Sequence, residues 1–195
     1  MKRTLFYAAI ILAAAVALNG CGYNKMQSQE EQVFAAWSNL ESNLQRRADL
    51  IPNLVNTVKA YAEHEESTIT EVIEARAKAT SINISRDDLD NGELMGKFQQ
   101  ARKELSSAMS RLMVVVERYP DLKADSHFTD LMHQLEGTEN RINVARQRYN
   151  EAARKFNYLI RKFPNNITNR LLLKLEPKEY FKAEPEAKQA QKVEF

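Results

Sequence analysis

Cysteine, glycine and proline are scarce in this chain of 195 residues, which contains one, five and five of them respectively. A single cysteine cannot form a disulfide within the chain, so the fold must be stabilised by packing alone. So few glycines and prolines, together with 28% charged residues, argue against a turn-rich sheet protein and against a disordered chain. The composition predicts one domain built from long helices.

An excess of positive charge is also missing once the N-terminus is set aside. The chain has 28 Lys and Arg against 26 Asp and Glu, and two of the basic residues are Lys2 and Arg3. The remainder therefore carries 26 charges of each sign. Because phosphate contacts dominate the affinity of nucleic-acid-binding proteins, this balance excludes nucleic acid as a partner.

Motifs of enzyme active sites are absent as well. There is no glycine-rich phosphate loop and no nucleophile elbow. His64 lies among glutamates, but the second histidine that a zinc-binding helix requires four residues later is replaced by Thr68. His127 and His133 are six residues apart, on different helix faces. We expect no catalytic residue, no metal and no cofactor, and therefore no enzyme.

The N-terminus has the layout of a secretory signal. Lys2 and Arg3 precede about 14 apolar residues from Leu5 to Leu18, and Cys21 follows directly after Leu18-Asn19-Gly20. We predict a lipoprotein-type signal peptide over residues 1–20 and lipid attachment at Cys21. The alternative is an uncleaved transmembrane anchor, although the run is short of the roughly 20 residues that cross a bilayer. Both alternatives place the rest of the chain outside the cytoplasm.

Apolar residues recur every three or four positions, which is the period of an amphipathic helix. The first stripe runs from Val33 to Ile73 and predicts one helix of roughly 50 residues, about 75 Å long. Pro52 lies inside it and lacks the N–H that would bond the carbonyl near Ala48. Because the stripe keeps its phase across Pro52, we predict a bend at this point and no break.

Two further stripes and their boundaries complete the predicted fold. After a loop over residues 80–92, a second helix starts near Asp90 and ends before Pro120; a third follows a cap at Asp125 or Ser126 and ends before Pro164. Short turns between long helices make them antiparallel. The predicted class is all-α, an elongated antiparallel bundle of three long helices over residues 30–170. Residues 21–29 are expected to form a tether, and residues 171–195 a short helix and tail packed on the bundle.

Several long motifs carry a resemblance to a known family. They are Tyr23-Asn24, Ala36-Trp37-Ser38, Arg46 to Val55, His64-Glu65, Tyr119 to Lys123, Thr138 to Ile142, Arg146 to Glu151, Asn157 and Phe163-Pro164. In these motifs the chain resembles the bacterial LemA family over nearly its whole length. The resemblance implies an all-helical extracytoplasmic domain that is tethered at its N-terminus, in a family without an established biochemical activity. The lipobox-like N-terminus departs from the plain transmembrane anchor that is commoner in the family.

Charged residues within the apolar stripe are the best candidates for a specific role. Arg47 and Glu65 both occupy stripe positions, where an unpaired charge costs several kcal/mol. They are 18 residues or about 27 Å apart along one helix, so each must find a partner on a neighbouring helix. The third helix offers Glu139, Arg141, Arg146 and Glu151.

Two roles stay open for these residues. They either fix the register between helices, as polar seam residues do in coiled coils, or form a partner-binding patch at the bend. The patch would consist of Arg46, Arg47, Asp49, Pro52 and Asn53. The remaining candidates are His64, Glu65, Glu139, Asn140, Arg146, Tyr149 and Asn150.

The sequence therefore favours a membrane-tethered interaction or scaffold module of the bacterial cell envelope. Its expected partners are membrane lipid, through the N-terminal anchor, and an envelope protein. The alternative is a structural protein that associates with copies of itself on the membrane surface, through apolar positions that the bundle leaves exposed.

Overall fold

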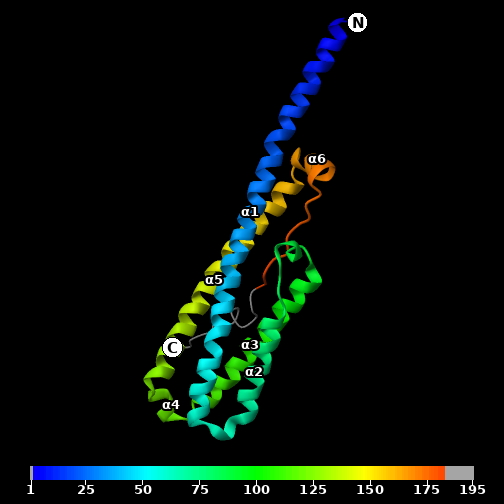
Figure 1. The fold of residues 1–195 in the computed structure, drawn as a ribbon. Helices are drawn as coiled ribbons and strands as arrows, with labels where there is room; N and C mark the ends of the chain where they lie inside the picture. Colours follow the sequence, from blue (N-terminus) through cyan, green and yellow to red (C-terminus); the bar gives the residue numbers. More distant parts are fainter. Residues whose placement is uncertain (1, 183–195) are drawn as a thin grey trace, which may run out of the picture.

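The computed structural model describes residues 2–182 (Figure 1). In the N-terminal helix, the described side chains are those of Arg3, Tyr7 and residues 22 onward. All regular elements in this part of the chain are helical, which confirms the predicted all-α class. The α-helices are α1 (Lys2–Tyr61), α2 (Glu66–Ser81), α3 (Gly92–Val116), α4 (Pro120–Ala124), α5 (Ser126–Arg161) and α6 (Asn165–Thr168). Short 3₁₀ turns span Glu63–Glu65 and Arg86–Asp88, and a π-helical turn spans Asn169–Leu173.

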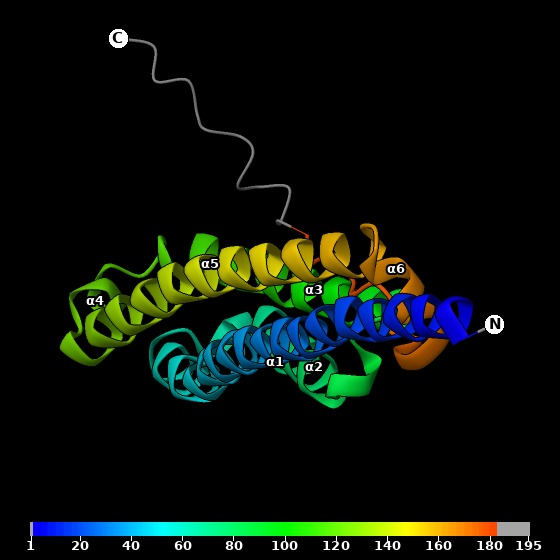
Figure 2. The ribbon, with the colours of Figure 1, turned by 90° about the horizontal axis from the view of Figure 1, so that it is seen from above.

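The long helices form an elongated antiparallel bundle. Helix α1 packs along α5, and α2 packs along α3. Figures 1 and 2 show α5 on one side of α1 and α2 on the other, with the N-terminal part of α1 extending beyond the bundle. Residues 21–29, which were predicted to form a tether, are part of helix α1, and Met26 is fully buried.

The single helix predicted from Val33 to Ile73 is wrong, because the chain reverses at Ala62. Ala62 leaves the helical conformation, with φ −131° and ψ 55°, and α2 then runs back against α3. Ile69 and Val72, which continue the apolar stripe in the sequence, belong to α2 and are buried in the same core as the apolar residues of α1. A signal for the reversal was present, since residues 62–68 contain no large apolar side chain.

Several helix ends follow the predicted local chemistry. Asp125 caps α5, and its carboxylate accepts a hydrogen bond from the backbone N–H of Phe128 at 2.9 Å. The predicted turn that begins at Pro120 is the one-turn helix α4, with proline in its first position. Helix α1 continues through Pro52 without ending, as predicted.

The core consists of two apolar clusters along the bundle. One surrounds Leu54 and Leu112 near α4, and the other surrounds Trp37, Tyr149 and Phe156 towards α6. The Trp37 ring lies 5.2 Å from the Tyr149 ring, and its indole N–H donates to the carbonyl of Ile84 at 3.3 Å. The two clusters together bury the apolar stripes of the four longest helices.

Residues 174–182, the C-terminal strap, complete the core at the α6 end. The short helix predicted within residues 171–195 lies mostly earlier, in α6 and the π-turn, and the chain is extended from residue 174 to residue 182 (Figure 1). Residues 183–195 of the predicted tail lie outside the described residues. The strap contacts α3 through Gln99 and α5 through Asn150, beyond the point where α2 has ended. Phe181 is 7% exposed and packs edge-on against Phe98. The strap therefore covers the part of the core that lies beyond the end of α2.

Candidate functional site

Pro52 creates a polar contact between α1 and α2. Because proline lacks an N–H, the carbonyl of Ala48 loses its intrahelical donor. The Arg76 side chain of α2 takes this place, and its Nε donates to the Ala48 oxygen at 2.6 Å. The freed carbonyl that the sequence predicted is therefore satisfied by a neighbouring helix.

Arg47 forms a polar link across three helices. Its guanidinium donates to Ser106 Oγ of α3 at 3.0 Å and lies 3.0 Å from Glu139 Oε2 of α5. The Arg47 side chain is 16% exposed. The interhelical pairing predicted for Arg47 is thus present, and Glu139 is the partner. Such a link is suited to fixing the register between helices.

Arg102 of α3, which the sequence analysis did not select, lies in the same interior. One Nη donates to the Leu44 carbonyl at 3.3 Å, and the guanidinium lies over the Phe98 ring at 4.9 Å. Its Nε has no hydrogen-bond partner among the residues that the structure describes. Burial, and then the charge of Arg47, lower the pKa of Arg102 to about 10. Its place on the apolar stripe between Phe98 and Leu105 was the signal that could have identified it.

Glu65 is paired too, but its predicted partner on the third helix is wrong. Its carboxylate lies 2.7 Å from Arg118 and accepts from the Tyr119 hydroxyl at 3.3 Å. Both partners lie just after the end of α3. Glu65 meets them there because the chain reversal at Ala62 places it at the same end of the bundle. His64 next to it is exposed. Within the described residues, no group of three or more His, Cys, Asp or Glu side chains could hold a metal ion.

The predicted patch around Pro52 is divided by the fold. Arg46, Asp49 and Asn53 are exposed on α1, whereas Arg47 points into the bundle. Asp49 accepts a hydrogen bond from Gln45 on its own helix at 2.8 Å. The structure therefore does not bring the five residues together as one surface.

Tyr149 and Asn150 hold the C-terminal strap. The Tyr149 hydroxyl donates to the Glu179 carbonyl at 2.7 Å, and burial followed by the Glu179 charge raises the pKa of Tyr149. The Asn150 amide bonds both the N–H and the carbonyl of Phe181, at 2.9 and 2.8 Å. Asn157 bonds both backbone groups of Lys178 in the same way. These three side chains thus replace the strand partner that an extended segment normally requires.

Lys178 ties the strap to the rest of the bundle through a buried ion pair. It is 6% exposed, and its Nζ lies 3.2 Å from both Glu30 Oε1 and Asp90 Oδ2. The ammonium also lies over the rings of Phe34 and Phe156. The Phe34 ring is consequently covered on this side and is only partly exposed.

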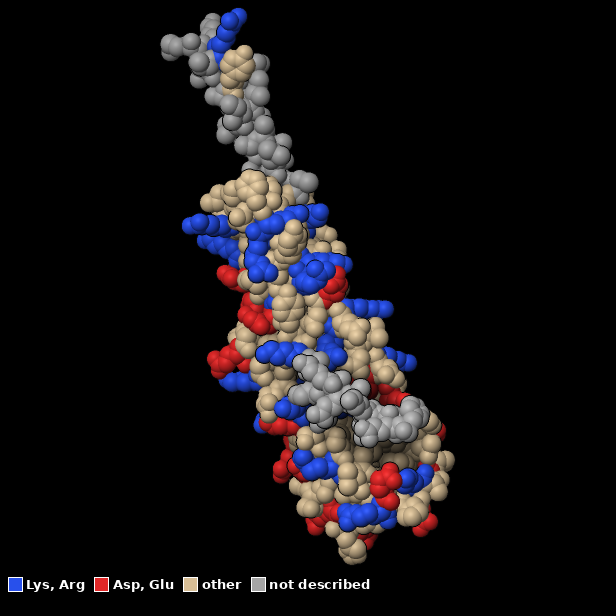
Figure 3. Space-filling model, turned by 180° about the vertical axis from the view of Figure 1, so that it is seen from behind, with Lys and Arg blue, Asp and Glu red and all other residues tan. Residues whose placement is uncertain are grey.

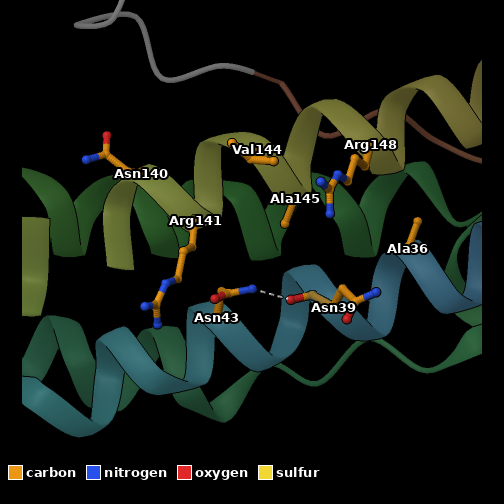
Figure 4. Close-up of a pocket in the computed structure, with 8 residues that line it drawn as sticks. All are labelled: Ala36, Asn39, Asn43, Asn140, Arg141, Val144, Ala145 and Arg148. Atoms are coloured by element: carbon orange, nitrogen blue, oxygen red, sulfur yellow. Dashed lines mark hydrogen bonds between the residues drawn. The ribbon is translucent and has the colours of Figure 1, made fainter. Parts of the chain in front are cut away.

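A groove of about 600 Å³ lies on the surface of the bundle between α1 and α5 (Figure 4). Its lining residues are Ala36, Asn39, Asn43, Asn140, Arg141, Val144, Ala145 and Arg148. The small side chains of Ala36 and Ala145 leave the space, and Arg141 points from α5 toward α1. Of the residues named from the sequence, Asn140 and Arg141 line this groove, and Arg141 does so without pairing with Arg47 or Glu65. Arg146 is half-buried elsewhere on α5.

The polar side chains of this groove have unused hydrogen-bonding capacity. Asn140, Arg141 and Arg148 make no hydrogen bond or ion pair with any residue that the structure describes, and Asn140 and both arginines are exposed. Guanidinium groups bind carboxylates through paired N–H donors, and amides bind backbone carbonyls and N–H groups. The groove can therefore bind a carboxylate-bearing protein segment without first breaking an internal contact.

The predicted anchor lies in the N-terminal part of α1. Cys21 is within the helix, but its side chain is outside the described ones. Across the part of the chain that was described, no helix is long and apolar enough to span a membrane.

Comparison with known proteins connects the chain to one family. The LemA family model matches residues 36–195. The magnetosome proteins MamQ 1 and MamQ 2 of Paramagnetospirillum magneticum are each 31% identical over 180 residues, covering 84% of this chain and 65% of theirs. MamQ of Magnetospirillum gryphiswaldense is 27% identical over 158 residues, covering 73% of this chain and 58% of its own. The chain thus matches less than two thirds of the length of these relatives.

Proposed function

This chain belongs to the LemA family, and from that premise we propose that it is a membrane-tethered helical module of the bacterial cell envelope. In this proposal the bundle lies outside the cytoplasm and binds a partner protein in the groove between α1 and α5. It performs no catalysis. The MamQ relatives are named as magnetosome proteins.

The proposed tether rests on the N-terminal pattern and on the continuity of α1. The proposed anchor is either lipidated or inserted in the membrane, and it is formed by Lys2 and Arg3, the apolar run Leu5–Leu18 and Cys21. Helix α1 continues from Lys2 to Tyr61, so the anchor leads directly into the bundle. The 21 residues from Leu18 to Asn39 place the groove about 32 Å from the end of the apolar run.

The groove carries the proposed binding function. Two unpaired arginines and an unpaired asparagine line one open surface, next to Val144, which is 47% exposed. Charge-assisted bonds from arginine to carboxylate are among the strongest hydrogen bonds in proteins. A partner segment with acidic side chains and one apolar contact fits this lining.

Photo-crosslinking in intact cells tests the proposal. A photoreactive amino acid at position 140, in the full chain, should capture one envelope protein, whereas the same amino acid at exposed Lys103 on α3 should not. The double variant Arg141→Glu and Arg148→Glu should abolish capture, and Lys103→Glu should leave it intact. Capture of copies of this chain alone would support the self-associating structural protein, and equal capture from positions 140 and 103 would refute the groove.

A further inference from the structure

At the end of the bundle from which the N-terminal part of α1 extends, polar side chains are buried and large apolar side chains are exposed. In α6 and the π-turn, the side chains that face inward include Asn165 and Thr168, which are 7% and 3% exposed. Large apolar side chains face outward instead: Ile167, Leu171 and Leu172 are 46%, 70% and 66% exposed, next to exposed Asn166 and Arg170. Isolated apolar residues on a surface are ordinary, but a cluster of this kind marks contact with something other than water.

Further exposed apolar side chains lie at this end of the bundle. Phe163 is 76% exposed directly after α5, and Tyr158 is 63% exposed in its last turn. Tyr23, in the part of α1 that contacts α6, is 40% exposed. The bundle tip, as used below, consists of Tyr23, Tyr158, Phe163, Ile167, Leu171 and Leu172.

Positive charge surrounds the bundle tip. Residues 152–175 contain six Lys and Arg and no Asp or Glu, and residues 1–29 contain three and none. Lys25, Arg161, Arg170 and Lys174 are exposed. On the face seen in Figure 3, the surface at this end of the bundle is uncharged, Lys and Arg lie next to it, and Asp and Glu appear further along the bundle. Aromatic and aliphatic side chains bordered by Lys and Arg are typical of proteins that lie on membrane surfaces.

The fold holds the bundle tip next to the anchor. A Cβ atom on Gly22 would lie 2.7 Å from Asn165 Oδ1, so glycine allows α6 to approach α1 at this point. Tyr23 is five residues beyond Leu18, or about 7.5 Å along the helix. The headgroup layer on each side of a bilayer is of similar thickness, roughly 5–8 Å. A lipid on Cys21 would bring the tip at least as close to the membrane.

We propose that the bundle tip docks on the surface of the membrane that holds the tether. Its apolar side chains lie at the boundary between headgroups and acyl chains, and its Lys and Arg residues contact anionic phospholipid headgroups. This inference rests on the proposed tether but adds a second contact with the bilayer. Two contacts restrain the direction of the bundle, whereas a single anchor leaves it free to swing.

Tryptophan fluorescence of the full chain, reconstituted in vesicles, measures this contact. The single native tryptophan, Trp37, is 2% exposed and provides a constant background. Phe163→Trp places a reporter in the tip, and Val114→Trp places one at an equally exposed position near α4, at the other end of the bundle. The vesicles contain phosphatidylcholine with phosphatidylglycerol, with or without bromine on the acyl chains, and flotation records membrane attachment.

We expect brominated lipid to quench most of the added emission of Phe163→Trp and none of that of Val114→Trp. If the chain floats with vesicles and Phe163→Trp is not quenched, the tether stands and the docking of the tip is refuted. If the chain does not float, both are refuted. Equal quenching at the two positions would also overturn the inference, because the bundle would then lie flat along the membrane.

The charge contribution has a matched control. In the Phe163→Trp background, Arg161→Glu with Arg170→Glu and Lys174→Glu should reduce quenching severalfold, and quenching should also fall when phosphatidylglycerol is omitted. Arg46→Glu with Lys59→Glu and Lys103→Glu makes the same charge change at exposed positions away from the tip. This control should retain full quenching. Equal loss in the two triple variants would refute a specific contact between the tip and anionic lipid.

Discussion

Replacing Arg76 by alanine tests whether the carbonyl that Pro52 leaves free is satisfied from α2. Ala48 is 1% exposed, so its carbonyl has little access to water once the Arg76 side chain is removed. A buried acceptor left without a partner costs about 1–3 kcal/mol. We expect Arg76→Ala to lower the free energy of unfolding by about 2 kcal/mol. For a domain of this size, that is a fall in melting temperature of roughly 4–8 °C.

Arg76 also packs against the bundle, so its loss alone does not isolate the hydrogen bond. Pro52→Ala separates the two effects, because an alanine at position 52 supplies the missing N–H to the Ala48 carbonyl. In that background Arg76→Ala should cost about 1 kcal/mol less than in the native chain. Pro52→Ala by itself should raise stability, since proline is unfavourable inside a helix.

Thermal and urea unfolding of the full chain in detergent, followed by far-UV circular dichroism, measures the four members of this cycle. Arg46→Ala, at an exposed position of α1 two residues before Ala48, serves as the control. It should change stability by less than about 0.5 kcal/mol. Equal costs of Arg76→Ala with proline and with alanine at position 52 would refute the argument, because the Arg76 contribution would then be packing alone.

Three further predictions concern ionisable groups. Lys178→Met leaves the Glu30 carboxylate buried without a cation and should cost about 3–5 kcal/mol in urea unfolding. Lys97→Met removes an exposed ion pair and should leave the urea midpoint nearly unchanged. Similar losses in the two variants would contradict a stabilising role of the buried Lys178 ion pair. Arg102→Met should leave the free energy of unfolding in urea unchanged or raise it by about 1 kcal/mol. Burial lowers the pKa of this arginine to about 10, and no carboxylate among the described residues lies in ion-pair contact with it. A large loss of stability would show that the hydrogen bond from Arg102 to the α1 backbone outweighs the cost of burying its charge. Hydrogen bonds from a backbone N–H of α5 and from a tyrosine hydroxyl lower the pKa of Asp125, so its contribution is present above the unfolded pKa of about 4 and is lost as pH falls through the lower folded value. Asp125→Asn should therefore make the acid limb of the stability curve shallower, and an unchanged limb would refute this assignment.

The chain sequence determined the features that depend on neighbouring residues. A period of three to four apolar residues defined the helices, Pro120 and Asp125 marked helix ends, and the missing N–H of Pro52 predicted a free carbonyl. The charge of Arg47 in an apolar stripe required an interhelical partner, and Glu139 was among the residues named for it. These predictions succeeded because they depend on backbone geometry and on the cost of an unpaired charge, which act locally.

Tertiary structure decided where the chain reverses, what covers the core at the α6 end, and which polar groups face outward. An apolar stripe with constant phase is compatible both with one long helix and with two antiparallel helices that share a core, so the phase alone did not reveal the reversal at Ala62. The gap in large apolar side chains over residues 62–68 was the only local signal of it. The strap is extended and takes its hydrogen bonds from Asn150 and Asn157, which lie more than 20 residues away in sequence. The groove and the inverted polarity of the bundle tip arise only when α1, α5 and α6 are packed together, because exposure is a property of the assembled surface and not of any segment alone.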